Sequence, residues 1–278
     1  MRGIFYIIII MTSSCFLSSC EADLDLVSTV PVIDGWIDTD GFPVVVFTES
    51  IIPNQEGGSI ADKIIRWGKV SIYDGEQEII LTGGPDNDII PPYRYITYKM
   101  KGEIGKTYKI TADYKTLHSE AEGTMLPPPA IKNIEISPIE SNDSLRSASL
   151  IFISPDDCPA YYYITMTDLK EEGRPLPAMM STFEASEPSK EYSIPLLHPK
   201  NNLSSAPFIP QLIKGEKWEV RLCRISKEVY EFWKAYDNAV MFGGSQFVNA
   251  SQSLKGNIIG GYGVWSVQGV SSQIIEIP

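Results

Sequence analysis

Most of the chain is patterned as short stretches in which apolar and polar residues alternate, and this pattern is typical of half-buried β-strands. In residues 69–73, for example, Val70 and Ile72 alternate with polar neighbours, and residues 107–112 repeat the pattern. An Asp74-Gly75 pair follows the first of these stretches and favours a hairpin turn. In the first half of the chain we therefore predict strands at residues 30–37, 43–48, 69–73, 78–81, 93–100, 107–112 and 117–123.

The clearest boundary in the chain is the segment Leu126-Pro127-Pro128-Pro129-Ala130. Three consecutive prolines form an extended connection and cannot donate hydrogen bonds to a sheet. Residues 170–210 are rich in Pro and Ser, so we expect a long surface excursion there, which is the best place for a binding loop. Beyond the prolines, the residue pattern predicts strands at residues 131–136, 148–153, 161–167, 218–225 and 273–277.

One segment near the C-terminus has helical periodicity. Ser226 is a suitable N-cap, and Gly243-Gly244 is a suitable stop, so we predict a helix at about residues 227–242. Its aromatic face either packs on a sheet as core or forms a ligand groove. The residues at helical spacing are Val229, Phe232, Trp233, Tyr236 and Val240.

These elements predict a mainly β protein with two tandem β-sandwich domains, immunoglobulin-like or transthyretin-like, of which the second carries the helix. The N-terminal sandwich is expected at residues 31–125 and the C-terminal sandwich at residues 131–278. Residues 126–130 form the proline-rich linker between them.

The first nineteen residues have the parts of an export signal. Arg2 supplies a positive start, and residues 4–11 are an apolar stretch too short to cross a bilayer, which takes about 20 residues. The following Leu17-Ser18-Ser19-Cys20 resembles the bacterial lipobox. We therefore expect residues 1–19 to be removed, Cys20 to be lipidated and residues 20–30 to form an acidic tether. The alternative is an ordinary signal peptide with an incidental cysteine.

The net negative charge argues against nucleic acid as a partner. Without residues 1–19 the chain has 22 Lys and Arg against 35 Asp and Glu, which gives a net charge of −13. Such an acidic body repels phosphate backbones. Besides the anchor, Cys158 and Cys223 remain. In an exported protein they can form a disulfide or stay as two buried thiols, and the sequence leaves both alternatives open.

The sequence lacks the motifs of familiar catalytic and metal sites. Neither His118 nor His198 belongs to a ligand-spaced motif, and there is no Gly-x-Ser-x-Gly elbow. Asp38-Thr39-Asp40-Gly41 opens like a calcium loop but lacks its later Glu, so a hairpin turn is favoured. Residues 256–263 lack the ending of a phosphate loop and are better explained as an irregular strand. We expect no enzymatic activity, cofactor or metal.

Aromatic side chains are the remaining candidates for recognition, because Tyr and Trp bury much area at low entropic cost. Core packing is the alternative role for each of them. The candidates are Trp36, Tyr93, Tyr95, Tyr161, Tyr163 and Trp265.

Several short motifs follow one another in an order that resembles the DUF4249 lipoproteins of Bacteroidetes. The resemblance covers nearly the whole chain after residue 19 and implies an outer-membrane lipoprotein, often encoded beside a TonB-dependent transporter. It brings no catalytic residues. The motifs are Cys20 with its acidic stretch, Val32-Ile33-Asp34-Gly35-Trp36-Ile37, Gly105-Lys106-Thr107-Tyr108, Pro127-Pro128-Pro129, Tyr230-Glu231-Phe232-Trp233, Gly256-Asn257-Ile258 and Gly260-Gly261-Tyr262-Gly263-Val264-Trp265.

From these observations we expect a non-enzymatic accessory lipoprotein of the outer membrane, held by lipid on Cys20, with the cell surface favoured over the periplasmic face. It would work beside a TonB-dependent transporter in nutrient uptake and capture a small-molecule or peptide ligand. The alternative is a structural or adhesive surface protein, because tandem sandwiches on a tether also build such proteins.

Overall fold

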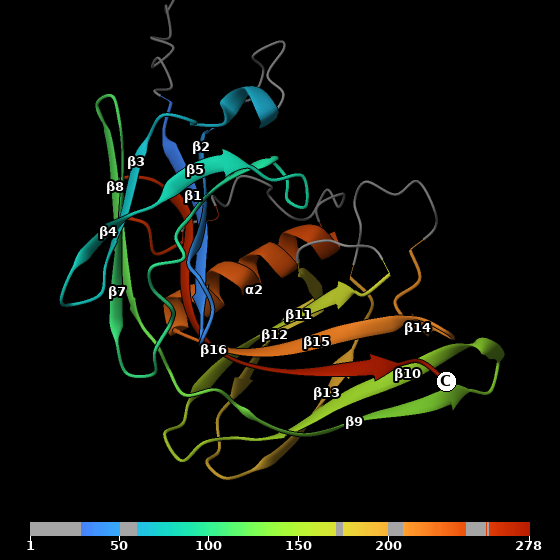
Figure 1. Cartoon of the computed structure of the whole chain (residues 1–278). Helices are drawn as coiled ribbons and strands as arrows, with labels where there is room; N and C mark the ends of the chain where they lie inside the picture. Colours follow the sequence, from blue (N-terminus) through green and yellow to red (C-terminus); the bar gives the residue numbers. More distant parts are fainter. Residues whose placement is uncertain (1–28, 51–59, 171–174, 200–207, 243–253, 255) are drawn as a thin grey trace, which may run out of the picture.

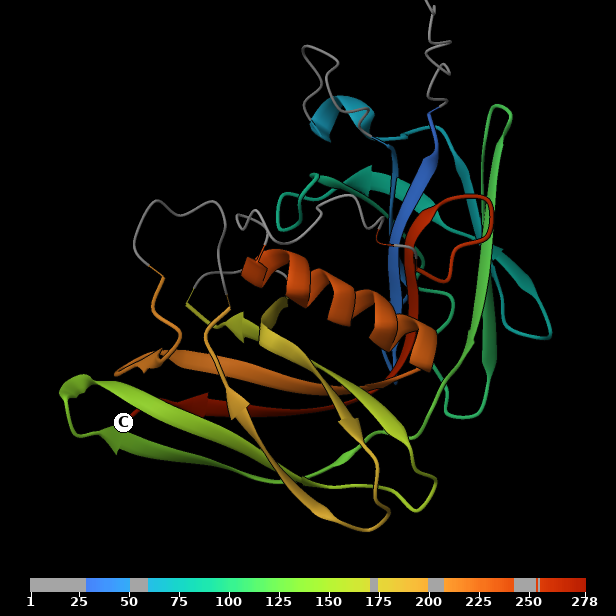
Figure 2. The same cartoon turned by 180° about the vertical axis from the view of Figure 1, so that it is seen from behind.

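The computed structural model describes residues 29–50, 60–170, 175–199, 208–242, 254 and 256–278. The predicted signal peptide, Cys20 and most of the predicted tether lie outside these residues. The protein is mainly β, and the described residues contain one α-helix, near the C-terminus. Two sandwich units meet at a corner, so that the strands of the first stand upright while those of the second lie across them (Figures 1 and 2).

The first unit is a sandwich of two sheets, as its alternating pattern predicts. One sheet has the order β4-β3-β7-β8, and the other contains β1, β2, β6 and β5. Val70, Ile72 and Ile110 are fully buried between the sheets, which confirms the predicted inward faces. The bounds are β1 Pro31–Asp38, β2 Val44–Glu49, η2 Ile60–Lys63, β3 Lys69–Tyr73, β4 Glu78–Ile80, β5 Thr82–Pro85, β6 Tyr93–Ile96, β7 Thr107–Tyr114 and β8 Leu117–Thr124.

The second unit is also a sandwich. Strands β12, β11, β15 and β16 form one layer, and β13, β10, β14 and β9 form the other. Leu150, Tyr162 and Leu222 are fully buried between these layers. The bounds are β9 Ala130–Ile139, β10 Asn142–Ile153, β11 Ala160–Asp168, β12 Leu176–Ala185, β13 Glu191–Leu196, β14 Leu212–Ile213, β15 Lys217–Ile225 and β16 Tyr262–Glu276.

Strand β16 belongs to both units. It pairs in parallel with β1 as far as Gln268 and then antiparallel with β15 from Gly269 onward. Its first half places Trp265 and Val267 in the core of the first unit. A single eight-stranded sheet, β12-β11-β15-β16-β1-β2-β6-β5, therefore runs through the corner. The predicted division into residues 31–125 and 131–278 differs from this arrangement, because the C-terminal part completes the N-terminal core.

The proline linker crosses β16 at the corner. A Cβ atom added to Gly269 would lie 2.2 Å from the carbonyl oxygen of Leu126, so glycine is what permits this close crossing. Ser271 Oγ donates a hydrogen bond of 2.7 Å to the carbonyl of Pro129 on the same segment. The linker is thus packed against the sheet that joins the two units.

The expectation of a long surface excursion at residues 170–210 is wrong for most of the described part, which forms strands. This segment contains β12 and β13, each an outer strand of its sheet. Pro177 and Pro195 lie within these strands. Proline is tolerated there because one side of an edge strand makes no hydrogen bonds to a neighbouring strand. Residues 175–180 of this segment nevertheless line the cavity described below.

Helix α2, Lys227–Phe242, has the predicted position. Ser226 acts as its N-cap, with the Val229 amide 3.4 Å from Ser226 Oγ. Val229 and Phe232 pack with Cys223 on the face of the large sheet opposite to β9 and β10 (Figure 2). The predicted stop at Gly243-Gly244 lies outside the described residues. Within the described part of the chain, no helix is long and apolar enough to cross a membrane.

Candidate functional site

The corner between the two units contains a cavity of about 570 Å³. It lies between α2 and the strands β1, β11, β12, β15 and β16. This volume is within the range of roughly 300–1,000 Å³ that is usual for small-molecule sites, which also favour boundaries between structural units. The site exists because β1 turns its half-buried face, including Asp34 and Trp36, away from the first core and toward the helix.

An aromatic cluster on α2 and β11 forms one wall. The ring of Trp233 stacks on Tyr163 with centroids 4.4 Å apart and planes inclined by 15°. Tyr236 meets Trp233 edge to face at 5.4 Å. Burial raises the pKa of Tyr163 well above its ordinary value, so this phenol stays neutral. Trp36 and Tyr163, two of the predicted recognition residues, line the cavity, and Trp233 and Tyr236 bring the predicted helix face to it.

An adjacent wall is formed by β12, at an irregularity in its pairing with β11. Thr182 pairs with Tyr163, and Pro177 pairs with Thr165, so residues 178–181 bulge out of the ladder. Met180 lies in this bulge with φ of 57°, which is uncommon for a residue with a side chain. The bulge turns apolar side chains of β12, including Met179 and Met180, toward the cavity.

The bulge is attached to α2 by Asp237. This buried carboxylate accepts hydrogen bonds from Ser181 Oγ at 2.9 Å and from the amide and hydroxyl of Thr182 at 3.2 and 3.0 Å. Burial raises the pKa of Asp237 above its ordinary value, although these hydrogen bonds oppose the rise. The helix and the bulged strand are therefore fixed directly to each other at the edge of the cavity. The sequence contained a signal for the role of Asp237. This residue follows Trp233 by four positions, so an acidic side chain lies on the otherwise aromatic face of the helix.

A polar group of residues lies at the β1–β16 side of the cavity. Arg221 on β15 donates to Asp38 at the end of β1. Gln268 Nε2 donates to the same carboxylate at 2.6 Å, and Ser266 Oγ donates to Gln268 Oε1 at 2.9 Å. Arg221, Gln268 and Ser266 line the cavity. The predicted turn at residues 38–41 is confirmed by the hydrogen bond of 2.9 Å from the Gly41 amide to the Asp38 carbonyl. The pairing of Asp38 with Arg221 was missed.

One buried polar atom of the cavity wall, the indole nitrogen Nε1 of Trp233, has no hydrogen-bond partner among the described residues. Leaving such a group unsatisfied costs about 1–3 kcal/mol, so native structures contain few of them. Trp233 lines the cavity, so an acceptor on a molecule bound there can satisfy its N–H.

The other predicted aromatic residues have structural roles. Trp265 is fully buried, and its indole nitrogen donates to the Tyr108 carbonyl at 3.0 Å. Tyr95 is also core. Tyr161 is half-buried and packs against Tyr230 of α2 at 5.0 Å between centroids. Core packing is thus the correct alternative for Trp265 and Tyr95.

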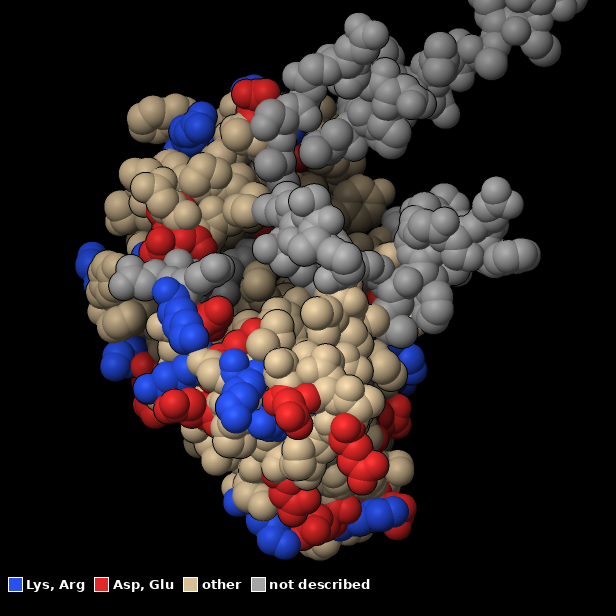
Figure 3. Space-filling view, turned by 90° about the vertical axis from the view of Figure 1, so that its right-hand side faces the viewer, with Lys and Arg blue, Asp and Glu red and all other residues tan. Residues whose placement is uncertain are grey.

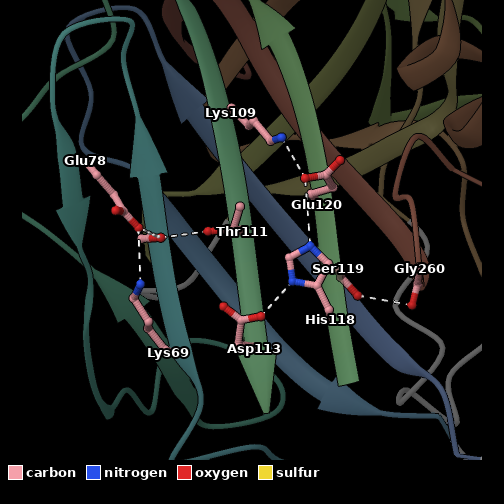
Figure 4. A network of polar contacts seen from close by, with 10 residues as sticks. Lys69, Glu78, Lys109, Thr111, Asp113, His118, Ser119, Glu120 and Gly260 are labelled. Atoms are coloured by element: carbon pink, nitrogen blue, oxygen red, sulfur yellow. Dashed lines mark hydrogen bonds and ion pairs between the residues drawn. The ribbon is translucent and has the colours of Figure 1, made fainter. Parts of the chain in front are cut away.

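The two histidines lie apart from the cavity. His118 Nδ1 is 2.6 Å from Asp113 on the outer face of the β4-β3-β7-β8 sheet, where Lys69–Glu78 and Lys109–Glu120 pairs also lie (Figure 4). These side chains are substantially exposed, and exposed ion pairs contribute at most about 1 kcal/mol each. His198 packs edge to face on Trp218. Among the described residues no group of three His, Cys, Asp or Glu side chains is arranged to hold a metal ion.

The disulfide between Cys158 and Cys223 that the sequence left open is not formed, and both residues are free thiols. Cys223 faces the helix side of β15 and is fully buried beside Val229. Burial raises the pKa of its thiol to about 12. Cys158 is half-buried before β11, and its thiol donates to the Pro155 carbonyl at 3.3 Å. Each thiol thus has its own environment.

Surface charge is mixed rather than divided into large fields. On the face drawn in Figure 3, Lys and Arg side chains intermingle with Asp and Glu over the part that the structure describes, and uncharged side chains cover the rest. This face offers no continuous basic surface for a phosphate backbone.

Comparison with known proteins identifies a family. Residues 20–274 match a family described as a domain of unknown function, DUF4249. No curated protein matches the chain.

Proposed function

Because the chain belongs to the DUF4249 family, whose description assigns no activity, we propose its function from the corner cavity. The protein is a non-enzymatic, ligand-capturing lipoprotein of the outer membrane that works beside a TonB-dependent transporter. Its ligand is a small molecule with an apolar, ring-bearing body and a few hydrogen-bonding groups.

The observation that carries this proposal is the cavity of about 570 Å³, whose aromatic wall contains an indole nitrogen, Trp233 Nε1, that has no partner in the described part of the chain. An apolar enclosure with a few polar groups is the usual form of a small-molecule site. A ring can pack against Trp233 and Tyr236, and an acceptor on the ligand can satisfy the indole nitrogen, which only donates.

Two charged groups of the cavity, Arg221 and Asp237, have structural partners, which supports binding rather than catalysis for them. Arg221 is engaged by Asp38, and Asp237 is engaged by Ser181 and Thr182. A general acid or base needs to exchange its proton with a substrate within hydrogen-bond reach. These side chains instead hold the walls together, so the site is built for a stable shape.

The lipobox at Cys20 and the acidic residues after it support the membrane location. The family resemblance supports the transporter as the partner, since DUF4249 lipoproteins are often encoded beside one. A capture subunit needs no active site, and its value lies in raising the local concentration of ligand at the transporter.

A fluorescent probe tests the cavity directly. N-phenyl-1-naphthylamine is an apolar amine with a naphthyl and a phenyl group that brightens in apolar sites, and we expect it to bind the lipidated protein saturably, one molecule per chain, above its signal in protein-free detergent. Trp233→Ala should weaken this binding roughly tenfold, or about 1.4 kcal/mol. Trp233→Phe keeps an aromatic ring but removes the indole N–H, so it tests the contribution of that hydrogen-bond donor to binding. Tyr98→Ala is the matched control, because Tyr98 is exposed and does not line the cavity. If wild type and Trp233→Ala, both shown to be folded by circular dichroism, bind the probe equally, the cavity is not the binding site.

An affinity pull-down tests the partner. Tagged protein purified from detergent-solubilised outer membrane should bring down a TonB-dependent transporter in stoichiometric amount. Recovery of the protein alone, together with binding to envelope or host polymers, would instead support the structural or adhesive alternative.

A further inference from the structure

The connection between η2 and β3 holds an exposed tryptophan on a rigid tip. Tyr95 OH donates to the Ile65 carbonyl at 2.7 Å and accepts from the Gly68 amide at 3.0 Å. Tyr93 OH donates to the Arg66 carbonyl at 3.1 Å. Between these fixed points the side chain of Trp67 is 90% exposed. Hydrogen bonds thus hold the backbone of this tip in place while the Trp67 side chain faces solvent.

This tip lies at the end of the first unit where the chain arrives from Cys20. The Ser50 amide donates to the Val30 carbonyl at 2.8 Å, which fixes the entry point beside the end of β2. Figure 1 shows the start of β1, the η2–β3 connection and the β7–β8 turn at the same end. From Cys20 to Pro31 is eleven residue steps, and a fully extended chain covers at most about 40 Å in that length. A lipid on Cys20 therefore keeps this end within about 40 Å of the bilayer, which lets the tip reach the membrane surface.

The charges at this end differ from the acidic balance of the whole chain. Arg66 and Lys115 are exposed here, and Lys69 is paired with Glu78 at 3.4 Å. The carboxylates nearby are Asp62, Glu49 and Asp113, of which Asp113 contacts His118. Among these folded residues cations and carboxylates are nearly balanced, so repulsion from anionic headgroups at this end comes mainly from the tether residues Glu21, Asp23 and Asp25.

We propose that this end docks on the lipid bilayer that carries the anchor, with Trp67 in the headgroup layer and Arg66 and Lys115 against lipid phosphates. Tryptophan favours this layer because its ring is apolar and its N–H is polar. A second contact beside the lipid chains fixes the orientation of the body as well as its location. Because β1 runs away from this end, docking holds the first unit upright on the membrane. The proposal rests on the lipid anchor of the proposed function but not on the cavity.

Depth-dependent quenching tests the docking. The mature lipidated chain is reconstituted into vesicles of phosphatidylethanolamine and phosphatidylglycerol, with or without brominated acyl chains, which quench tryptophan on contact. We expect brominated lipid to quench wild type more than Trp67→Phe. The matched control is the double variant Trp67→Phe/Tyr98→Trp, because Tyr98 packs against Phe42 beyond the far end of β1, roughly 26 Å away by strand length. This control should be quenched no more than Trp67→Phe.

The outcomes separate the anchor, the docking and the cavity. Equal quenching of wild type and Trp67→Phe on an intact anchor overturns the docking alone. A mature chain whose mass shows no lipid on Cys20 overturns both anchor and docking, and the dye titration of the cavity is unaffected by either result. If Trp67 is protected from aqueous acrylamide only when a co-purified protein is present, the tip binds protein and the lipid assignment is wrong. The double variant Arg66→Glu/Lys115→Glu should be quenched less by brominated lipid than wild type.

Discussion

Arg221 on β15 and Asp38 at the end of β1 form an ion pair between the two units, with side chains only 12% and 20% exposed. The pair sits where β16 changes partner, because Gln268, the last residue paired with β1, donates to the same Asp38 carboxylate. Asp38 thus joins the two units and holds Arg221 and Gln268, which line the polar side of the cavity.

Removing Asp38 should destabilise the protein because it leaves Arg221 charged and poorly solvated. We expect Asp38→Ala to lower the free energy of unfolding by about 2 kcal/mol, somewhat less than the roughly 3–5 kcal/mol for fully buried pairs. The double variant Asp38→Ala/Arg221→Met should cost less than the sum of the single changes. Urea unfolding measures this, with Lys69→Ala as the control in an exposed pair, for which about 0.5 kcal/mol or less is expected. Strictly additive costs would show that Arg221 and Asp38 do not interact.

The strands of the first unit were predictable because each has one buried face and one polar face. β3 matches its predicted bounds, and the alternation in β7 correctly places Tyr108 and Ile110 inward. The outer strands β12 and β13 were missed because Pro177 and Pro195 argue against a strand unless its place at a sheet edge is known.

The division of β16 between two units was not predictable, because it depends on pairing across the whole chain. Trp265 pairs with Gly35, which lies 230 positions earlier, and no local pattern encodes this partner. The helix face at Trp233 was predicted, including the alternative of a groove. Whether that face lines a cavity depends on where β1 and β12 lie, so the site required the structure.

The attachment of α2 through Asp237 predicts a pH dependence of stability. Burial raises the pKa of Asp237 above its ordinary value of 3.8, so the folded protein keeps this proton to higher pH than the unfolded chain does. The stability that Asp237 contributes is therefore greatest below pH 3.8 and declines as pH rises through its folded-state pKa. Relative to Asp237→Asn, wild type should lose stability across this window. Urea unfolding of both proteins over a pH series measures the difference, and a difference that rises with pH would refute the account.

Cys223 should be inert toward thiol reagents in the native protein. The thiolate is the reactive form, and burial raises the pKa of this thiol to about 12, while the half-buried Cys158 is more accessible. Brief treatment with iodoacetamide at pH 8 should modify Cys158 faster than Cys223, and unfolding in urea should make the two rates similar. Peptide mass spectrometry assigns each site. Native modification of Cys223 as fast as Cys158 would mean that the helix side of β15 opens readily.

Gly263 should be the most sensitive glycine of β16, for two reasons that act together. Its φ of 102° lies in the left-handed region that side chains rarely adopt, and an added Cβ would lie 1.9 Å from the Ile33 carbonyl oxygen of β1. Since backbone strain of this kind alone costs about 1–3 kcal/mol, we expect Gly263→Ala to destabilise the protein by at least about 2 kcal/mol. Gly84→Ala is the matched control on β5, because no atom lies within 4 Å of an added Cβ there and its φ is not positive. Thermal unfolding of both variants measures the contrast. Equal melting temperatures would show that β1 and β16 can separate at Gly263 without loss of stability, and that the close packing of these two strands does not hold the corner.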